Sequence, residues 1–434
     1  MTSRRSVLPA LATLAMSAAA FAFGPILPSP VMPAGVEAGR GLALRLPRGV
    51  THLQLDQNLV EALPKDGSFT LIGFPLSDGR LVDLELERFD PIAPDAEIKV
   101  GTLADDGTWL QEAGIVRPDV KCFRGTIAGQ PDSVAFLSFA ATSNVGLITT
   151  EADETFSMSD GTLEEAGPLV IADMHALPED AIQWAPFQCG NSGGTPKPAM
   201  KSSPGAGLPR TGCKLFKLAV DTDFEFYDRF PSSPNKATNA LTYLSQQIGA
   251  FSTVYYNQLN VDATLQYLRL WKTKPTTGYP YKSNYASSGG MGAFLADVMA
   301  RWTANTTDTA VTRDLVMALS GQALGGGVAN DFGVVCSKTA GYCVAGSLNL
   351  AFPYPLQNKN AQNWDCIAFM HEIGHCFGAY HPHDTGDDDC FKPDYSGVGA
   401  CTLRAQGTIM SYCHLCSGGL ANINFRFSTR NKSS

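Results

Sequence analysis

Apolar and polar residues alternate at every second position in short runs between about residues 24 and 210. Examples are 42–46, 69–74 and 81–86, and the runs are separated by Asp-Gly pairs and prolines, which favour turns. Because successive side chains of a strand point to opposite faces, this pattern predicts a β-rich domain in the first half of the chain.

From Cys213 onward, longer segments with apolar residues at helical spacing separate the apolar runs. The glycine-rich run 325–329 is either an edge strand that pairs with a bound peptide or a plain loop. In chain order, the pattern predicts a strand at 215–221, an amphipathic helix at 235–256, a strand at 261–271, a helix at 291–302, a strand at 314–320 and a helix at 364–377. This order predicts an α/β (α+β) fold with a central twisted mixed sheet and long helices.

The N-terminus has the features of an export signal. Arg4 and Arg5 precede an apolar run, and Ala20-Phe21-Ala22 offers a cleavage site. A general secretory signal and a twin-arginine signal both fit, so we expect a secreted or periplasmic protein. No later run is long and apolar enough to anchor the chain in a membrane.

A segment rich in Gly, Ser, Pro and Lys separates the two halves of the chain and suits an exposed, cleavable linker, with Arg210 as one plausible processing point. We predict a signal peptide at 1–22, a β-rich domain at 23–189, a linker at 190–212 and a second domain at 213–434.

The composition is that of a soluble globular protein, with 44% hydrophobic and 17% charged residues. The net charge of -9 gives no reason to expect nucleic acid or an anionic membrane as a partner, and we expect a monomer.

Eleven cysteines behind an export signal predict several disulfides. Without Cys122 and Cys189 the count is odd, so at least one thiol stays free, and Cys376 is our candidate. Plausible disulfide partners are Cys336 with Cys343, and some of Cys390, Cys401, Cys413 and Cys416.

The segment from His371 to His381 reads H-E-x-x-H-x-x-G-x-x-H. His371 and His375 lie four apart, so on a helix they project from one face and can bind one metal ion at about 2.0–2.1 Å. Gly378 is placed to end that helix, because glycine enters the left-handed conformation without a Cβ penalty, and His381 can then return as a third ligand.

Three protein ligands leave a fourth position open, which is typical of a catalytic zinc site, and Glu372 is placed to act as general base. Two other interpretations remain: ordinary helix residues with a solvated Glu372, or a zinc site without activity. The presence of Glu372 argues against the second.

Downstream, Gly407-Thr408-Ile409-Met410-Ser411-Tyr412 resembles the Met-turn of the metzincin zinc metalloproteases. Together the two motifs resemble the reprolysin/adamalysin branch, in particular its bacterial secreted members. The resemblance implies a metzincin catalytic domain with a zinc-binding helix, and it makes Met410 a hydrophobic base under the histidines. Tyr412 is typical of astacin- and serralysin-like relatives, in which it helps to stabilise the oxyanion; otherwise it is a half-buried tyrosine.

The segment that starts at Cys122 resembles a reprolysin-type propeptide, although the second cysteine of that family is missing near Ala140. Cys189 precedes Gly190, as in the "cysteine switch" of such propeptides, in which a thiolate occupies the fourth zinc position. A plain disulfide is the alternative for Cys189. The resemblance therefore identifies 23–189 as a β-rich propeptide and 213–434 as the catalytic domain.

Around the third histidine the chain departs from the family. Asp384 follows His381 by three residues, although reprolysins place an aspartate directly after the histidine, and His383 is a competing ligand that the spacing disfavours. The acidic run Asp384, Asp387, Asp388 and Asp389 is either a calcium (Ca²⁺) site or a solvated loop. Little chain follows the Met-turn, so we expect a very short closing helix or a truncated domain.

The sequence predicts a secreted zinc (Zn²⁺) metalloendopeptidase that is made as a zymogen and activated by another protease or by self-cleavage, with proteins or peptides as substrates. Two alternatives stay open: a binding or adhesion protein with a catalytically weak metzincin fold, and a zinc amidase that acts on non-peptide bonds.

Overall fold

The computed structural model describes residues 24–34, 47–161, 166–178, 188–191, 214–233, 235–348, 350, 365–390, 401–402 and 406–433. The predicted signal peptide, the predicted strand at 42–46, most of the predicted linker and Cys213 lie outside the described residues.

The first sheet has ten strands, all from the N-terminal region, which we define as residues 24–178. The strand order is β1-β4-β5-β8-β9-β10-β11-β12-β3-β2, and neighbours are antiparallel except for β1 and β4. The helix α1 (Gln57–Ala62) follows β3. The strands are β1 (Ile26–Pro28), β2 (Val31–Pro33), β3 (Val50–Leu55), β4 (Ser68–Pro75), β5 (Leu81–Phe89), β8 (Lys121–Ile127), β9 (Gln130–Phe139), β10 (Asn144–Thr149), β11 (Thr155–Gly161) and β12 (Ala166–Asp173).

The second sheet has eight strands in the order β13-β17-β18-β16-β14-β15-β6-β7. It is mixed, because β17 is antiparallel to β18 and β7 is antiparallel to β6, whereas the other neighbours are parallel. The strands are β6 (Ile92–Leu103), β7 (Trp109–Gln111), β13 (Gln188–Cys189), β14 (Lys214–Thr222), β15 (Val261–Trp271), β16 (Leu315–Leu319), β17 (Gly326–Ala329) and β18 (Tyr342–Ala345).

Among the described residues, the α-helices other than α1 belong to the C-terminal domain, which we define as residues 214–433. They are α2 (Phe224–Asp228), α3 (Lys236–Leu259), α4 (Gly290–Ala304), α5 (Thr306–Ala310), α6 (Asp365–Cys376), α7 (Pro382–Thr385) and α8 (Thr429–Ser433), with short 3₁₀ helices at Tyr285–Ser287, Cys413–Leu415 and Gly419–Asn422. Among the described residues, no helix has a stretch long and apolar enough to cross a membrane.

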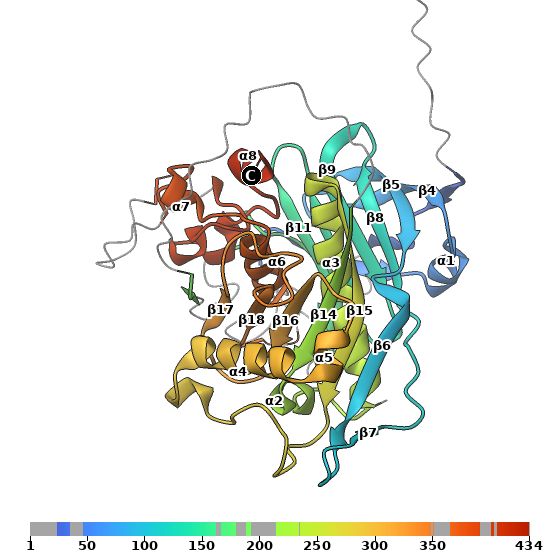
Figure 1. Ribbon diagram of the computed structural model, residues 1–434. Coiled ribbons are helices and arrows are strands. Elements are labelled where there is room, and N and C mark those ends of the chain that lie inside the picture. The colour runs from blue at the N-terminus through green and yellow to red at the C-terminus, as the bar shows by residue number, and fades with distance from the viewer. Residues whose placement is uncertain are drawn as a thin grey trace, which may run out of the picture.

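The two faces of the second sheet carry different helices. On β16, Met317 belongs to the core that contains α3 and α6, whereas Val316 and Ala318 belong to the core that contains α4. This is the alternation that the pleat of a strand imposes. The C-terminal domain is thus a sandwich of helices around a sheet (Figure 1).

Helix α3 packs against both sheets. It begins after Asn235, whose side chain caps the Thr238 N–H, and ends at Asn260, which has a left-handed φ of 57°. It contacts β15 of the second sheet and β8, β9 and β10 of the first sheet. Residues 239–255 are all buried, so almost the whole circumference of the helix is covered. A helix that is buried on all sides has a weak amphipathic pattern, and its flanking sheets decide its position.

The mixed α/β architecture and the β-rich N-terminal region agree with the sequence-based expectation, and each predicted element of the C-terminal half is present within a few residues. The prediction omitted β18. It also assigned 92–111 to a separate domain, whereas β6 and β7 extend the second sheet. The division of the chain into domains stays a prediction.

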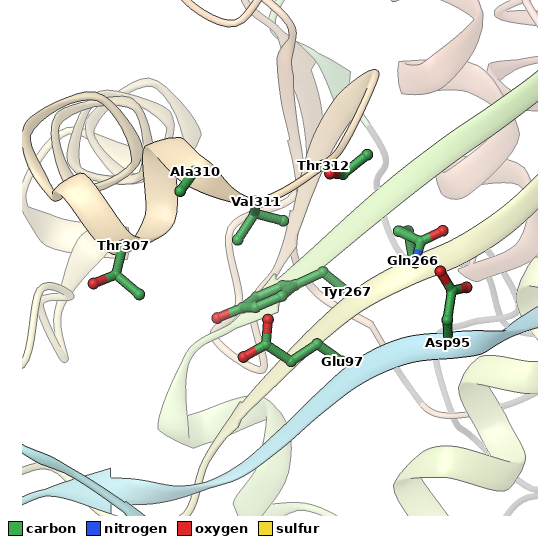
Figure 2. Close-up of a pocket in the computed structure, with 8 residues that line it drawn as sticks. All are labelled: Asp95, Glu97, Gln266, Tyr267, Thr307, Ala310, Val311 and Thr312. Atoms are coloured by element: carbon green, nitrogen blue, oxygen red, sulfur yellow. The ribbon is translucent and has the colours of Figure 1, made fainter.

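The junction between β6 and the C-terminal domain contains a cavity of about 370 Å³. Asp95 and Glu97 of β6 form one wall, and Gln266 and Tyr267 of β15 with residues of 307–312 form the other (Figure 2). The cavity therefore exists only where the two parts of the chain meet.

Cys390 is bonded to Cys413 and Cys401 to Cys416, as the sequence allowed. The predicted Cys336–Cys343 bridge is wrong, because Cys336 is exposed whereas Cys343 lies in the core with Cys376. Cys376 is free, as predicted, and among the described residues Cys122, Cys189 and Cys366 are free as well.

Candidate metal centre

Helix α6 carries two of the three histidines. All of its residues are buried, and the spacing of four places His371 and His375 one above the other, with their Nε2 atoms 3.2 Å apart. The helix stops at Gly378, which has a φ of 100° and whose N–H donates to the carbonyl of His375. The predicted role of Gly378 in turning the chain matches this geometry.

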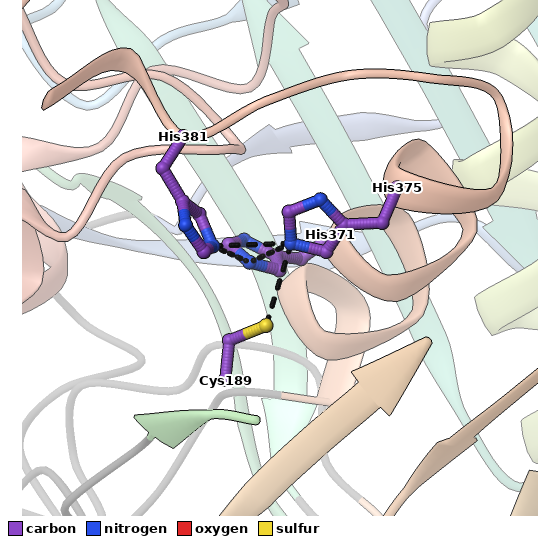
Figure 3. Close-up of side chains that lie close together, drawn as sticks. All are labelled: Cys189, His371, His375 and His381. Atoms are coloured by element: carbon purple, nitrogen blue, oxygen red, sulfur yellow. Dashed lines mark hydrogen bonds between the residues drawn. The ribbon is translucent and has the colours of Figure 1, made fainter. Parts of the chain in front are cut away.

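After this turn, His381 comes back towards α6. Its Nε2 atom lies 3.2 Å from that of His371 and 3.0 Å from that of His375 (Figure 3). Two nitrogens bonded to one tetrahedral zinc ion at 2.0–2.1 Å would be about 3.3 Å apart, so the three imidazoles have close to the required spacing.

The hydrogen bonds of the opposite ring nitrogens set the tautomers. His371 Nδ1 lies 2.8 Å from the carbonyl oxygen of Ile409, and His375 Nδ1 lies 2.8 Å from that of Ala379. A carbonyl can only accept, so each Nδ1 carries the proton and each Nε2 presents a lone pair to the centre.

Burial keeps these rings neutral. It lowers the pKa of His371 to about 4, and burial followed by the neighbouring imidazoles lowers the pKa of His375 and His381 well below the usual value. The converging Nε2 lone pairs of neutral imidazoles cannot hydrogen-bond to one another, whereas a cation between them would interact with all three. The donor chemistry therefore fits a divalent metal ion such as zinc.

Cys189 adds a fourth donor from the N-terminal half of the sequence. Its Sγ lies 3.3 Å from His375 Nε2, and the ligand atoms of Cys189 and the three histidines lie within 4.8 Å of one another (Figure 3). One thiol with three imidazoles is a donor set that suits a closed, four-coordinate zinc ion. Burial and then the Glu372 carboxylate raise the pKa of the Cys189 thiol well above its usual value. A bound cation would lower the pKa of this thiol.

We call Gln188–Asn191 the Cys189 arm. It forms β13, which pairs in parallel with the edge strand β17, and the Gly190 N–H donates to the carbonyl of Gly327 at 2.8 Å. Residues 326–329 of this run form a strand that pairs with an extended segment, so the plain-loop interpretation is wrong, whereas pairing with a bound peptide stays a prediction. Here the segment comes from the chain itself.

Asn191 clamps the arm, and sequence reasoning missed it. Its Oδ1 accepts from the Ala329 N–H and its Nδ2 donates to the Ala329 carbonyl, both at 2.7 Å. The side chain thereby continues the ladder that β13 begins. The sequence signal that could have identified Asn191 is its position two residues after Cys189.

Glu372 is fully buried beside the metal-binding atoms. Its Oε2 lies 3.7 Å from the Sγ of Cys189, and its Oε1 has no hydrogen-bond partner among the described residues. Burial raises the pKa of this carboxyl well above its usual range. Gly327 leaves the room that this side chain occupies, because a Cβ there would lie 2.6 Å from Glu372 Oε1.

The turn at Met410 lies against α6. A Cβ on Gly374 would be 2.6 Å from the sulfur of Met410, so the methionine packs directly beside the metal-binding helix. The same turn supplies the Ile409 carbonyl that orients His371. Tyr412 reaches the other side of the centre, where its hydroxyl donates to the Cys189 carbonyl at 3.2 Å.

His381, and not His383, has its ring nitrogen in one cluster with those of His371 and His375. His383 stacks on His381, with the rings 12° from parallel and their centroids 5.1 Å apart. Asp384 lies 3.4 Å from His381 Nδ1, which is where a carboxylate orients a metal-binding imidazole. An aspartate three residues after the histidine thus reaches its ring.

The acidic run does not converge on one point. Asp387 lies near Ser428 and Arg430, Asp388 accepts from the Ser411 hydroxyl, and Asp389 accepts from Thr402. Calcium binding there stays a prediction. The chain closes with the short helix α8.

Residues 213–423 match the Reprolysin_5 family, described as metallo-peptidase family M12. A comparison with the curated proteins found no match. A chain in the solved structure entitled "Structure of a chaperone-substrate complex" is similar over 39% of this chain and 24% of that chain, with 14% sequence identity and a TM-score of 0.24, which is too weak to support an argument. The family match and the geometry agree, and residues 213–423 are a reprolysin-like metzincin domain of the M12 metallopeptidases.

Proposed function

We propose that this protein is a secreted zinc endopeptidase made as a zymogen that Cys189 keeps inactive. The observation that carries the proposal is the convergence of three imidazole Nε2 lone pairs and one thiol, beside a buried carboxylate. His371, His375 and His381 would hold the ion. Zinc bound there would lower the pKa of a water molecule and polarise the carbonyl of a peptide.

Glu372 is the general base of this mechanism. Burial raises its pKa, which makes the carboxylate a stronger base, and the unpartnered Oε1 can accept a proton from the attacking water. The protonated carboxyl then delivers that proton to the amine that leaves.

Tyr412 would stabilise the developing oxyanion. In the zymogen its hydroxyl donates to the Cys189 carbonyl, so the group is already positioned to donate to a carbonyl oxygen at this place. When the Cys189 arm leaves, the same hydroxyl becomes available to the substrate. The arm and an extended substrate would both use the free edge of β17, so they exclude each other.

The test compares the processed protein with its Glu372→Gln variant in cleavage of casein and of a quenched fluorescent peptide library. We expect one bound zinc ion per chain in both proteins, and activity only in the processed wild type. Activity in the variant, or activity that survives removal of the metal by a chelator, would refute the mechanism. Stoichiometric zinc without turnover of any peptide would instead indicate the binding or adhesion protein.

The inhibitory role of Cys189 has a separate test. We expect the unprocessed Cys189→Ala variant to cleave the peptide substrate or to process itself faster than the unprocessed wild type. Equal rates would count against a cysteine switch and would leave the catalytic role of Glu372 untouched.

A further inference from the structure

The N-terminal region and the C-terminal domain are joined by more than the linker, because β6 and β7 of the N-terminal region are strands of the second sheet. Strand β6 pairs in parallel with β15, and backbone hydrogen bonds mark both ends of the contact, from Leu265 N–H to Pro91 and from Lys272 N–H to Gly101. Loss of β6 would leave β15 as an open edge, and on the released fragment it would expose Val100 of β6, which is fully buried in the main core.

Polar side chains of α3 depend on the first sheet for their partners. Gln246 exchanges two hydrogen bonds with Ser143 at 3.0 and 3.1 Å. Asn257 donates to the carbonyl of Gly125 at 2.8 Å. If the N-terminal region left, α3 would expose one side to water along with its apolar residues.

Gly249 lies in the middle of α3 and faces Phe136 of β9. A Cβ at this position would be 2.8 Å from the Phe136 ring and 3.5 Å from the Sγ of Cys122. A glycine inside a helix costs about 0.5–1 kcal/mol relative to alanine. Its presence here lets the first sheet pack directly on the helix backbone.

Arg124 of β8 fixes the contact electrostatically. It is buried, contacts both carboxylate oxygens of Asp262 at 2.5 and 3.3 Å, and binds Glu87 at 2.7 Å. Its guanidinium also lies over the ring of Tyr256 at 3.9 Å. Asp262 and Tyr256 belong to the C-terminal domain, so one buried charge joins the two parts.

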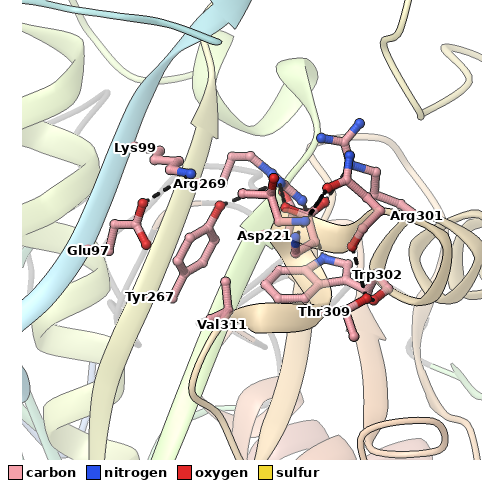
Figure 4. A network of polar contacts seen from close by, with 12 residues as sticks. Glu97, Lys99, Asp221, Tyr267, Arg269, Arg301, Trp302, Thr309 and Val311 are labelled. Atoms are coloured by element: carbon pink, nitrogen blue, oxygen red, sulfur yellow. Dashed lines mark hydrogen bonds and ion pairs between the residues drawn. The ribbon is translucent and has the colours of Figure 1, made fainter. Parts of the chain in front are cut away.

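The hairpin β6–β7 also covers a buried ionic network. Arg269 of β15 pairs with Asp221 and Asp308 and is 2% exposed (Figure 4). Burial raises the pKa of Asp221, but the Arg269 guanidinium together with hydrogen bonds from Tyr281 and Trp302 outweighs burial, so the pKa lies below its usual value. Trp109 of β7 packs on Trp271 near this network, with centroids 5.1 Å apart. Water entry would weaken the ion pairs.

We propose that the N-terminal region stays bound as a non-covalent subunit after the linker is cut, and that the mature enzyme consists of both fragments. The α3 and β15 surface of the C-terminal domain is then a permanent binding surface, and its occupant is residues 24–178. This inference rests on the processing that the proposed function includes, but it does not require peptidase activity.

The experiment replaces residues 198–204 of the full chain with the recognition sequence of a site-specific protease. The cut protein is run on size-exclusion chromatography in 0.15 M and about 1 M salt with a reductant, and the fractions are analysed on denaturing gels. We expect both fragments to co-elute at the position of the uncut chain. Separate peaks would overturn the proposal. Co-elution without peptidase activity would support it and would show that the proposed function had failed.

A matched pair of variants locates the contact surface. Arg124→Ala removes the buried charge at the junction, and Arg80→Ala removes an exposed arginine whose partners, Asp78 and Glu154, lie within the N-terminal region. On dilution of the cut protein, we expect Arg124→Ala to release at least about tenfold more free N-terminal fragment than wild type, and Arg80→Ala to behave as wild type. Equal release from both variants would overturn the assignment of this surface.

Discussion

The Asn191→Ala variant tests how the Cys189 arm is held. The Asn191 side chain makes two hydrogen bonds to the backbone of Ala329, both at 2.7 Å, and accepts a longer one from the Cys189 Sγ at 3.5 Å. A typical hydrogen bond contributes about 0.5–1.5 kcal/mol net, so loss of the two bonds to Ala329 should destabilise the bound arm by about 1–3 kcal/mol. Ala329 is 2% exposed, and its N–H and carbonyl would then lack these partners, which favours the upper end of that range. The population of released arm should rise about 5- to 150-fold.

The assay follows alkylation of Cys189 by iodoacetamide in the unprocessed protein, with mass spectrometry of the peptide that contains it. The rate reports the released population if the arm opens and closes faster than the reagent reacts. Cys336 is exposed and free, so the experiment uses a Cys336→Ser background. The readout does not depend on peptidase activity.

Asn330→Ala is the matched control. Its Nδ2 donates to the carbonyl of Ala340 at 3.1 Å, and its side chain has no described hydrogen bond to the arm. The control should alkylate at the wild-type rate. A rate for Asn191→Ala within twofold of wild type would show that the clamp does not hold the arm and would refute the reasoning.

Three further predictions concern other parts of the structure. Gly249→Ala should lower the free energy of unfolding, measured in urea, although alanine has the better helix propensity. Gly292→Ala on α4, where nothing crowds the added methyl group, should raise the free energy of unfolding by about 0.5–1 kcal/mol. A change of the same sign in both variants would contradict the packing of Gly249 against Phe136. Burial raises the pKa of Asp223 to about 6. The protonated carboxyl therefore contributes fully to the free energy of unfolding below about pH 4, and this contribution is lost as the pH rises through 6. Over this range the metal-free wild type should lose about 3 kcal/mol of stability that Asp223→Asn does not lose. Identical pH profiles from urea titrations would rule this out. Gly327→Ala should displace Glu372 and reduce kcat/KM of the processed enzyme about 100-fold while zinc content stays the same; unchanged kinetics would show that the carboxylate position tolerates the shift.

The histidine half of the candidate site was accessible from the sequence because it is local. His371 and His375 share a helix turn, and Gly378 bends the chain, so short-range rules predict how these residues approach one another. The clamp formed by Asn191 was not accessible, since its partner Ala329 is 138 residues away. No local periodicity encodes such a pairing.

The same limit explains what the sequence missed in the fold and the wrong disulfide. Alternation in the first half of the chain predicts strands but not their partners, and the partner of β6 is β15 of the other half of the chain. Cys336 and Cys343 are close in sequence, which suggested a bridge. The pleat of β18 directs Cys343 into the core, whereas Cys336 stays at the surface.

The position of the Cys189 arm has a kinetic consequence if the N-terminal region is retained. A cut between residues 192 and 212 leaves Cys189 close to the new C-terminus of a fragment that is still bound, so the thiol remains tethered near the zinc ligands. A short tether gives an effective concentration in the millimolar range, and dilution of the enzyme does not lower it while the two fragments stay bound. Such an enzyme would behave as its own competitive inhibitor after the first cut, and full activity would require a second cut before Gln188 or chemical blocking of the thiol.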